Sequence, residues 1–345
     1  MSYRLKRQAG LTLVELMIAT TLSLVLLAGV LLVFSANKTT YQMQGGLGTL
    51  QENGRYAVRQ ITSDLQMAGF GGCLSPRLGP RIVMVTSSPP SFLTEFAAGD
   101  FFIGVDGAAT NYGGTTSVAG TDSIEIRGPL RSKVNLVNGE ILTTGNVTII
   151  GDDSGLVAND YVMISDCGGG EVFRATAVST SGGNTQIAHA TSLNTQAALS
   201  RGYAPDSVVT ELATHTYFVA DTGRTNTTGQ AILALYRFDG TTATELVDGV
   251  EDLQIEYGLD TDADGKIDAF RGVDPSGVGT AMTAANWNQV MAVRVSLLMN
   301  SVDGASSVVA PYTYFPASSN QITPTNDFRL RQEFTAMVSV RNSVL

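Results

Sequence analysis

The segment from Leu11 to Phe34 constrains the fold of this chain more than any other stretch. Among its 24 residues only Glu15 is charged. Because an α-helix rises about 1.5 Å per residue, this segment as a helix would be roughly 36 Å long, enough to cross a hydrocarbon core of about 30 Å with some tilt. Arg4, Lys6 and Arg7 precede it, and positive charge keeps that end in the cytoplasm. The sequence therefore predicts a membrane-spanning helix over residues 11–34.

Glu15 is unusual in this setting, because an acidic side chain at the bilayer centre costs about 2.5–3.5 kcal/mol. Its position near the cytoplasmic end lowers this cost. One interpretation is a carboxylate in the first helical turns, where the helix macrodipole favours negative charge. The other is that Glu15 faces a charged partner, as ionisable groups inside membranes usually do. Composition alone leaves both interpretations open.

A short basic leader ends at Gly10 and is followed by LTLVELMIA, from Leu11 to Ala19. This pattern resembles the type III signal of the type IV pilin superfamily, in which a prepilin peptidase cuts after the glycine and methylates the new N-terminus. The resemblance implies a leader peptide over residues 1–10, cleavage between Gly10 and Leu11, and N-methylation of Leu11. The first mature residue of the family is usually phenylalanine, so Leu11 departs from the pattern.

The fifth mature residue in the same family is glutamate, which is the place of Glu15 here. Cleavage would create an α-amino group about 6 Å along the helix from Glu15. An ammonium and a carboxylate on adjacent subunits would neutralise one another in an apolar bundle, whereas unpaired copies would each be costly. We therefore expect Glu15 to set the axial register of assembling subunits.

Two other interpretations of this segment fit less well. A secretory signal peptide has an apolar region of about 7–15 residues and then a small-x-small cleavage site, and this run is longer with no convincing site after it. A plain single-pass anchor matches the hydropathy equally well, but it does not explain why Gly10 and Glu15 occur together.

A second helical segment, residues 35–69, follows the membrane span. Gly45, Gly46 and Gly48 predict a weak point within it, and the glycine-rich run after residue 68 predicts its end. We expect residues 35–69 to be the periplasmic, amphipathic half of one long helix, lying against an exported head. The apolar residues that recur at helical spacing are Leu47, Leu50, Val58, Ile61, Leu65 and Ala68.

From residue 70 onwards the pattern changes to short β-branched or alternating runs separated by Gly, Asn, Asp and Pro, which predicts strands. The expected fold class is α+β, a long N-terminal helix packed on a large, mainly antiparallel β head over residues 70–345. Whether the head is one sheet system or two lobes divided near residues 195–210 stays open. The expected strands are Arg81–Val85, Ser123–Arg127, Asn146–Ile150, Tyr161–Ser165, Glu171–Val178, His215–Val219, Ala231–Phe238, Leu253–Tyr257, Gln289–Leu298 and Phe334–Arg341.

Two further stretches resemble the PilW family of minor pilins. The segment LQENGRYAVRQITSDLQMAGFGGC, from Leu50 to Cys73, is similar to a family helix that leads to a glycine–cysteine pair. The end of the chain, from Phe334 to Asn342, is similar to the family's closing strand, with Val340 where leucine is usual. The resemblance implies a structural subunit that is a substrate of prepilin peptidase and is not itself an enzyme.

The chain has two cysteines, Cys73 and Cys167. A head delivered to the oxidising periplasm is expected to pair them in a disulfide, for which the chain-entropy model gives roughly 4–5 kcal/mol. PilW-like sequences resemble this one in having a second cysteine after an Ile-Ser-Asp step. A catalytic cysteine would need His189 or His215 as its base, and the strand-like surroundings of both histidines make this alternative much weaker.

The segment from Asp260 to Asp268 matches the first nine positions of an EF-hand-type calcium loop. Arg271 stands at the twelfth position in place of the usual glutamate, and the alternative is an acidic β-turn without metal. Because four carboxylates within nine residues repel one another without a cation, we favour Ca²⁺. The expected ligands are the side chains of Asp260, Asp262, Asp264 and Asp268 and the backbone carbonyl of Lys266.

Acidic residues outnumber basic ones by 31 to 21, a formal net charge of −10. Without a basic patch, the head is not expected to bind nucleic acid directly. The resemblance implies a subunit of the tip or priming complex of a type IV pilus, supporting adhesion, twitching motility or DNA uptake. Its partners would be other minor pilins, the major pilin, a tip adhesin and prepilin peptidase.

The expected location changes with assembly. Before assembly the protein would span the inner membrane once, with a cytoplasmic N-terminus and a periplasmic head, and afterwards it would lie in the pilus at the cell surface. The main alternative is a minor pseudopilin of a type II secretion system, which shares the signal, the β head and sometimes calcium. A third class, a calcium-dependent enzyme or adhesin on a simple anchor, predicts an unprocessed N-terminus.

Overall fold

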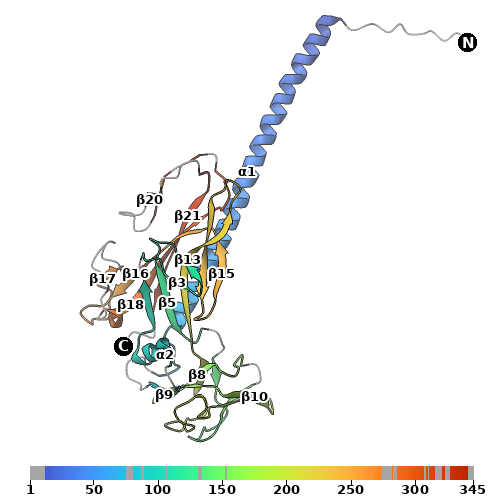
Figure 1. Ribbon diagram of the computed structural model, residues 1–345. Helices are drawn as coiled ribbons and strands as arrows, with labels where there is room; N and C mark the ends of the chain where they lie inside the picture. Colours follow the sequence, from blue (N-terminus) through green and yellow to red (C-terminus); the bar gives the residue numbers. More distant parts are fainter. Residues whose placement is uncertain are drawn as a thin grey trace, which may run out of the picture.

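One long helix, α1 (Leu13–Met67), and a β-rich head packed on its C-terminal half make up the part of the chain that the structure describes (Figure 1). The computed structural model describes residues 12–74, 81–86, 89–105, 107–130, 134–151, 154–273, 282, 286–306, 308, 309, 311–314, 321, 322 and 327–340. The expected α+β fold class, a long N-terminal helix on a mainly antiparallel β head, is confirmed.

The helix α1 runs through 55 residues. Its N-terminal half is exposed and apolar enough to cross a membrane, as the sequence predicted. The weak point expected at Gly45, Gly46 and Gly48 is wrong, since the helix continues through all three. Each glycine costs only about 1 kcal/mol relative to alanine, and a helix nucleated on both sides propagates at little further cost. At Gly46 a Cβ would lie 2.8 Å from the Cβ of Ala305, so glycine permits this close contact with the head.

The C-terminal half of α1 buries one face against the head. Leu50, Gly54, Ala57, Ile61 and Leu65 are the buried residues, and their spacing of three or four positions places them on one side of the helix. Burying a leucine or isoleucine side chain contributes about 1.5–3 kcal/mol. This stripe therefore attaches the head to the helix, as the amphipathic pattern predicted, although Leu47 of that pattern is 41% exposed.

Two antiparallel sheets lie beside this half of α1, and we call them the proximal lobe. Both sheets hold the helix, because α1 contacts β15 (Ala243–Asp248) of one sheet and β18 (Val290–Asn300) and β21 (Arg331–Ser339) of the other. The first sheet has the strand order β15 (Ala243–Asp248), β14 (Ala231–Phe238), β13 (Ala213–Thr225), β5 (Ser123–Gly128) and β2 (Phe102–Val105). The second has the order β17 (Ala269–Arg271), β16 (Val250–Leu259), β18 (Val290–Asn300) and β21 (Arg331–Ser339).

Two smaller sheets form the end of the head that lies farthest from the start of α1, and we call them the distal lobe (Figure 1). A separate hydrophobic cluster, which includes Ile164, Phe173 and Tyr203, fills this lobe. The head therefore has two lobes, a question that the sequence left open. One sheet has the order β1 (Arg81–Val83), β9 (Gly169–Arg174), β8 (Tyr161–Asp166), β12 (Val208–Glu211) and β6 (Asn135–Leu136), and the other has β10 (Ala177–Ser181), β11 (Asn184–Ala188) and β7 (Val147–Ile150).

A short helix that the sequence analysis missed joins the two lobes. This helix, α2 (Ser91–Ala98), contacts β1 on the distal side and β5 on the proximal side. Its Leu93 and Phe96 are buried. The remaining elements are the hairpins β3 (Asn111–Tyr112) with β4 (Thr115–Thr116) and β19 (Tyr312–Thr313) with β20 (Gln321–Ile322), and the 3₁₀ turn η1 (Trp287–Gln289).

The single strand expected over Glu171–Val178 is wrong, because the chain changes sheet within it. The side chain of Asn194 accepts a hydrogen bond from the backbone N–H of Arg174 (2.7 Å) and donates one to the Arg174 carbonyl (2.9 Å). This amide satisfies the last groups of β9, and the chain then enters β10 of the other distal sheet. A contact from a residue 20 positions later was not predictable from the local pattern.

Alanine at Gly54 is expected to destabilise the head, because a Cβ there would lie 2.3 Å from Cε2 of the Phe334 ring. Displacing that ring should cost about 1–3 kcal/mol. Gly48 is a matched control in the same helix, since a Cβ there meets nothing within 4 Å. Gly48→Ala should stabilise the protein by about 0.5–1 kcal/mol. Thermal unfolding of the two variants in detergent checks this, and equal shifts of the same sign would contradict it.

Candidate functional site

Glu15 takes part in a capping box at the start of α1. The backbone N–H and the hydroxyl of Thr12 both donate to Oε2 of Glu15 at 3.0 Å, and the Glu15 N–H donates to Oγ1 of Thr12 at 3.3 Å. These bonds satisfy helix N–H groups that have no partner within the helix. The carboxylate is thereby directed back toward the N-terminal end of the helix, where the sequence analysis expects a new α-amino group.

The cleavage and methylation positions, Gly10 and Leu11, lie outside the described residues. The apolar side chains of the helix that follows them are exposed. From Leu13 to Phe34 every large apolar side chain is exposed, and such a surface requires lipid or other apolar helices around it. Within the described part of the chain, Glu15 is the one acidic residue in this apolar run.

A buried polar cluster joins the other end of α1 to the proximal lobe. Oδ2 of Asp64 accepts hydrogen bonds from the hydroxyl of Tyr217 (2.6 Å) and from Nδ1 of His215 (2.7 Å), both on β13. His215 and Tyr217 are 1% and 0% exposed. Burial, and then the charge of Asp64, raise the pKa of the Tyr217 hydroxyl above its usual range. Asp64 therefore fixes the helix on the sheet.

This role of Asp64 was not predicted from the sequence. The available signal was the alternation of His215 and Tyr217, which puts two polar-tipped side chains on one face of a strand. Only the packing of α1 on β13 brings a carboxylate to them.

The predicted disulfide between Cys73 and Cys167 is present, with the two Cα atoms 4.8 Å apart. It joins the chain just beyond α1 to the end of β8. A second contact lies beside it, since the Ser165 hydroxyl donates to the Gly71 carbonyl at 2.9 Å. Gly72 has a φ of +68° and its Cβ position lies 2.7 Å from Val208, so glycine is required at this corner. The disulfide therefore links the end of α1 covalently to the distal lobe.

The cysteine–histidine alternative has no support in the described residues. Both cysteines are oxidised, so neither offers a thiolate. His215 is bonded to Asp64, and His189 is 4% exposed, with Nε2 at 2.9 Å from the Gly145 carbonyl and its ring against Phe173. Each histidine therefore belongs to a packed core.

The acidic loop brings three of its four aspartates together. One carboxylate oxygen from each of Asp260, Asp262 and Asp268 lies within 4.8 Å of the others. Ca²⁺ binds oxygen ligands at about 2.3–2.6 Å, so ligands on one ion lie at most about 5 Å apart. The observed spacing fits a shared Ca²⁺. Arg271 lies on β17, paired with β16, so the twelfth position continues into a strand instead of a helix.

The carboxylate of Asp264 lies outside this group of three. Asp264 accepts hydrogen bonds from the backbone N–H and from Nζ of Lys266, at 2.8 and 2.7 Å.

Within the group of three, Asp268 accepts two hydrogen bonds from Thr261, one from its N–H and one from its hydroxyl, both at 2.7 Å. Those bonds lower the pKa of Asp268 and keep its carboxylate ionised. The loop is therefore prearranged by bonds from its own backbone.

Comparison with known families gives two matches. Residues 216–342 match the family model described as type IV pilus-assembly protein W, and residues 5–31 match the prokaryotic N-terminal methylation motif. The first covers the proximal lobe from β13 to β21, and the second covers the start of α1. A comparison with curated proteins found no match.

Proposed function

Because this chain is a PilW-like type IV minor pilin, we propose that it is a structural subunit of the complex that primes pilus assembly and remains at the pilus tip. The observation that carries this proposal is the position of Glu15, a carboxylate held at the start of an exposed apolar helix and directed toward its N-terminal end. Processing after Gly10 would place a cationic α-amino group near that carboxylate. The protein would act as a substrate of prepilin peptidase and perform no catalysis.

The shape of the molecule supports a terminal position in the filament. The distal lobe extends the head well away from the start of α1 (Figure 1), and a subunit at the tip has fewer neighbours to accommodate it. Its partners would be other minor pilins, the major pilin and a tip adhesin, first in the inner membrane and later at the cell surface. The match to a pilus-assembly model favours this role over a type II secretion pseudopilin.

Glu15→Gln tests the assembly role. Removing the charge should leave membrane insertion unchanged, because the helix becomes more apolar, while incorporation into sheared pili should fall at least tenfold. Quantitative immunoblots of membrane and pilus fractions measure both, and Glu52→Gln, an exposed acid of the same helix, is the control. Undiminished incorporation of Glu15→Gln would contradict the role.

Mass spectrometry of the N-terminus separates processing from assembly. Mature protein from cells with an active prepilin peptidase should begin at Leu11 and carry one methyl group. Protein that keeps residues 1–10 in such cells would contradict the proposed function as a whole, and would favour a simple membrane anchor.

We further propose that the acidic loop binds Ca²⁺ through Asp260, Asp262 and Asp268, with the Lys266 carbonyl as an additional ligand. The support is the convergence of three carboxylate oxygens within 4.8 Å and the preference of Ca²⁺ for such hard oxygen ligands. A bound ion would hold the connection between β16 and β17 in one conformation, which would present a fixed loop to a neighbouring subunit.

Calcium at 100 times its dissociation constant should stabilise the protein by about 2.7 kcal/mol, which raises the melting temperature by roughly 5–10 °C for a head of this size. Asp262→Ala should abolish that increase. Asp206→Asn, an exposed aspartate with a positive φ that asparagine tolerates, should keep it. A melting temperature that does not respond to Ca²⁺ in the wild type would exclude the site.

A further inference from the structure

A pocket of about 440 Å³ lies where the two lobes meet, beside α2. Its volume is in the range of about 300–1,000 Å³ that is typical of small-molecule sites, and such sites are common between domains. Phe92 of α2, Tyr161 and Arg174 of the distal lobe, and Asp239 and Thr241 of the turn between β14 and β15 are among the residues that line it. Both lobes and the helix between them therefore contribute to one pocket.

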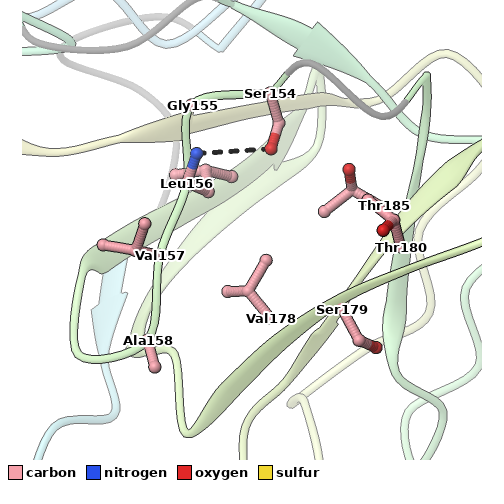
Figure 2. A pocket seen from close by; sticks show the side chains of 9 residues that line it. All are labelled: Ser154, Gly155, Leu156, Val157, Ala158, Val178, Ser179, Thr180 and Thr185. Carbon is pink, nitrogen blue, oxygen red and sulfur yellow. Dashed lines mark hydrogen bonds between the residues drawn. The ribbon is translucent and has the colours of Figure 1, made fainter.

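A second hollow, of about 510 Å³, lies over the hairpin of β10 and β11 in the distal lobe (Figure 2). Its described lining residues, such as Leu156, Val178 and Thr180, carry neither a charge nor an aromatic ring. The pocket between the lobes differs, since it combines two aromatic rings with charged side chains of both signs. A few polar groups among aromatic side chains are what gives a small-molecule site its specificity.

Arg174 is held in place with part of its guanidinium unused. Its Nε donates to the Asn159 carbonyl at 3.1 Å, and its Cζ lies 5.5 Å from the centre of the Tyr161 ring, its partner across the β8–β9 ladder. Asn194 holds the backbone of Arg174 through the two hydrogen bonds described above. Neither Nη1 nor Nη2 of Arg174 has a hydrogen bond or an ion pair within the described chain. The lining therefore includes a fixed, planar pair of donors.

Acceptors and an apolar surface accompany this guanidinium. Asp160 uses one carboxylate oxygen, Oδ2, to accept the Val157 N–H at 2.7 Å, and its Oδ1 accepts no bond from the described residues. The Tyr161 hydroxyl is likewise without a partner in this part of the chain. The rings of Phe92 and Tyr161 pack edge to face, with their centroids 5.7 Å apart. Unused donors and acceptors thus lie beside a pair of aromatic rings.

The charges of the lining favour a neutral ligand. Asp160, Glu211 and Asp239 all line the pocket, so their carboxylates would repel a phosphate or a nucleic acid. Arg174 has no ion-pair partner among the described residues, so its charge would repel a cation. A neutral ligand that carries several hydroxyls avoids both costs, because each hydroxyl can donate and accept. A sugar ring has such hydroxyls around its edge and C–H groups on its faces.

We propose that the pocket between the lobes binds a neutral carbohydrate. Arg174 would donate to two adjacent hydroxyls, Asp160 would accept from a hydroxyl, and Phe92 and Tyr161 would contact the C–H groups of the ring. This activity goes beyond the assembly role and does not depend on it. The pocket adjoins α2, which lies far from the start of α1 (Figure 1), so a membrane around α1 would not cover it.

The test applies labelled full-length protein in detergent to an array of neutral, sialylated and sulfated glycans, and the strongest neutral ligand is then titrated by calorimetry. Arg174→Lys is the informative variant, because lysine keeps the positive charge and loses the planar pair of donors. Arg201→Lys is the matched control, since Arg201 also lies over a tyrosine of the distal lobe, with Cζ 5.1 Å from the Tyr203 ring centre, and does not line the pocket. Affinity should fall at least tenfold in Arg174→Lys and change less than about twofold in Arg201→Lys.

A second variant keeps the result independent of how Arg174→Lys folds. Tyr161→Phe removes only a hydroxyl and keeps the ring that packs on Phe92, and it should weaken binding at least threefold. Absence of binding by every neutral glycan up to millimolar concentration would overturn the proposal. Binding by sialylated or sulfated glycans alone would overturn it, and so would wild-type affinity in both Arg174→Lys and Tyr161→Phe.

Discussion

Asp64→Ala is expected to destabilise the protein by about 3 kcal/mol. The substitution removes the acceptor of the Tyr217 and His215 hydrogen bonds, which measure 2.6 and 2.7 Å. Both donors are almost fully buried, so neither can turn to bulk water. A buried polar group left without its partner costs about 1–3 kcal/mol, and more when a charge was involved.

Thermal unfolding of full-length protein in detergent checks this, with an expected fall of roughly 6–12 °C. Asp64→Asn keeps an acceptor oxygen and should recover part of the loss. Glu52→Ala, an exposed acid on the same helix, should change the melting temperature by less than about 2 °C. If Asp64→Ala lowered the melting temperature no more than Glu52→Ala does, Asp64 would not hold the helix on the sheet.

The second large loss of stability is expected when Cys73 and Cys167 are both replaced by serine. The two residues are 94 positions apart in the sequence, and cross-linking a loop of this length restricts the unfolded chain strongly. Removal of a native disulfide typically costs about 2–5 kcal/mol. We expect the distal lobe to be affected most, because the bond ties β8 to the end of α1.

Reduction of the wild-type protein provides the matched comparison. Dithiothreitol should lower the wild-type melting temperature to that of the double variant and should not change the variant itself. If the reduced protein and the double variant both melted like the oxidised wild type, the disulfide would contribute nothing to stability. Limited proteolysis would show new cleavage first in the distal lobe.

The features predicted correctly from the sequence depend on local patterns. Three of these features can be recognised from residues within a few turns of one helix. They are the apolar run, the lone Glu15 within it and the periodic leucines of α1. The strand at Ser123 and those at Ala231 and Val290 were found because β-branched residues cluster there. The pairing of Cys73 with Cys167 was predictable because the chain offers one possible pair.

One error occurred where a distant residue decides the local structure, and another where a helix is too short to show a period. Asn194 ends β9 and splits a predicted strand in two. The short helix α2 was missed because its eight residues are too few for a clear helical period.

By itself, the sequence determined that the chain has an apolar N-terminal helix bearing one acid and continues as a β-rich head with a disulfide. These properties follow from side-chain chemistry along the chain, which is independent of how the chain is folded. Only the tertiary structure decided that Asp64 meets His215 and Tyr217 and that the head has two lobes. Such contacts join residues up to about 150 positions apart, and local propensity contains no information about which distant surfaces pack together.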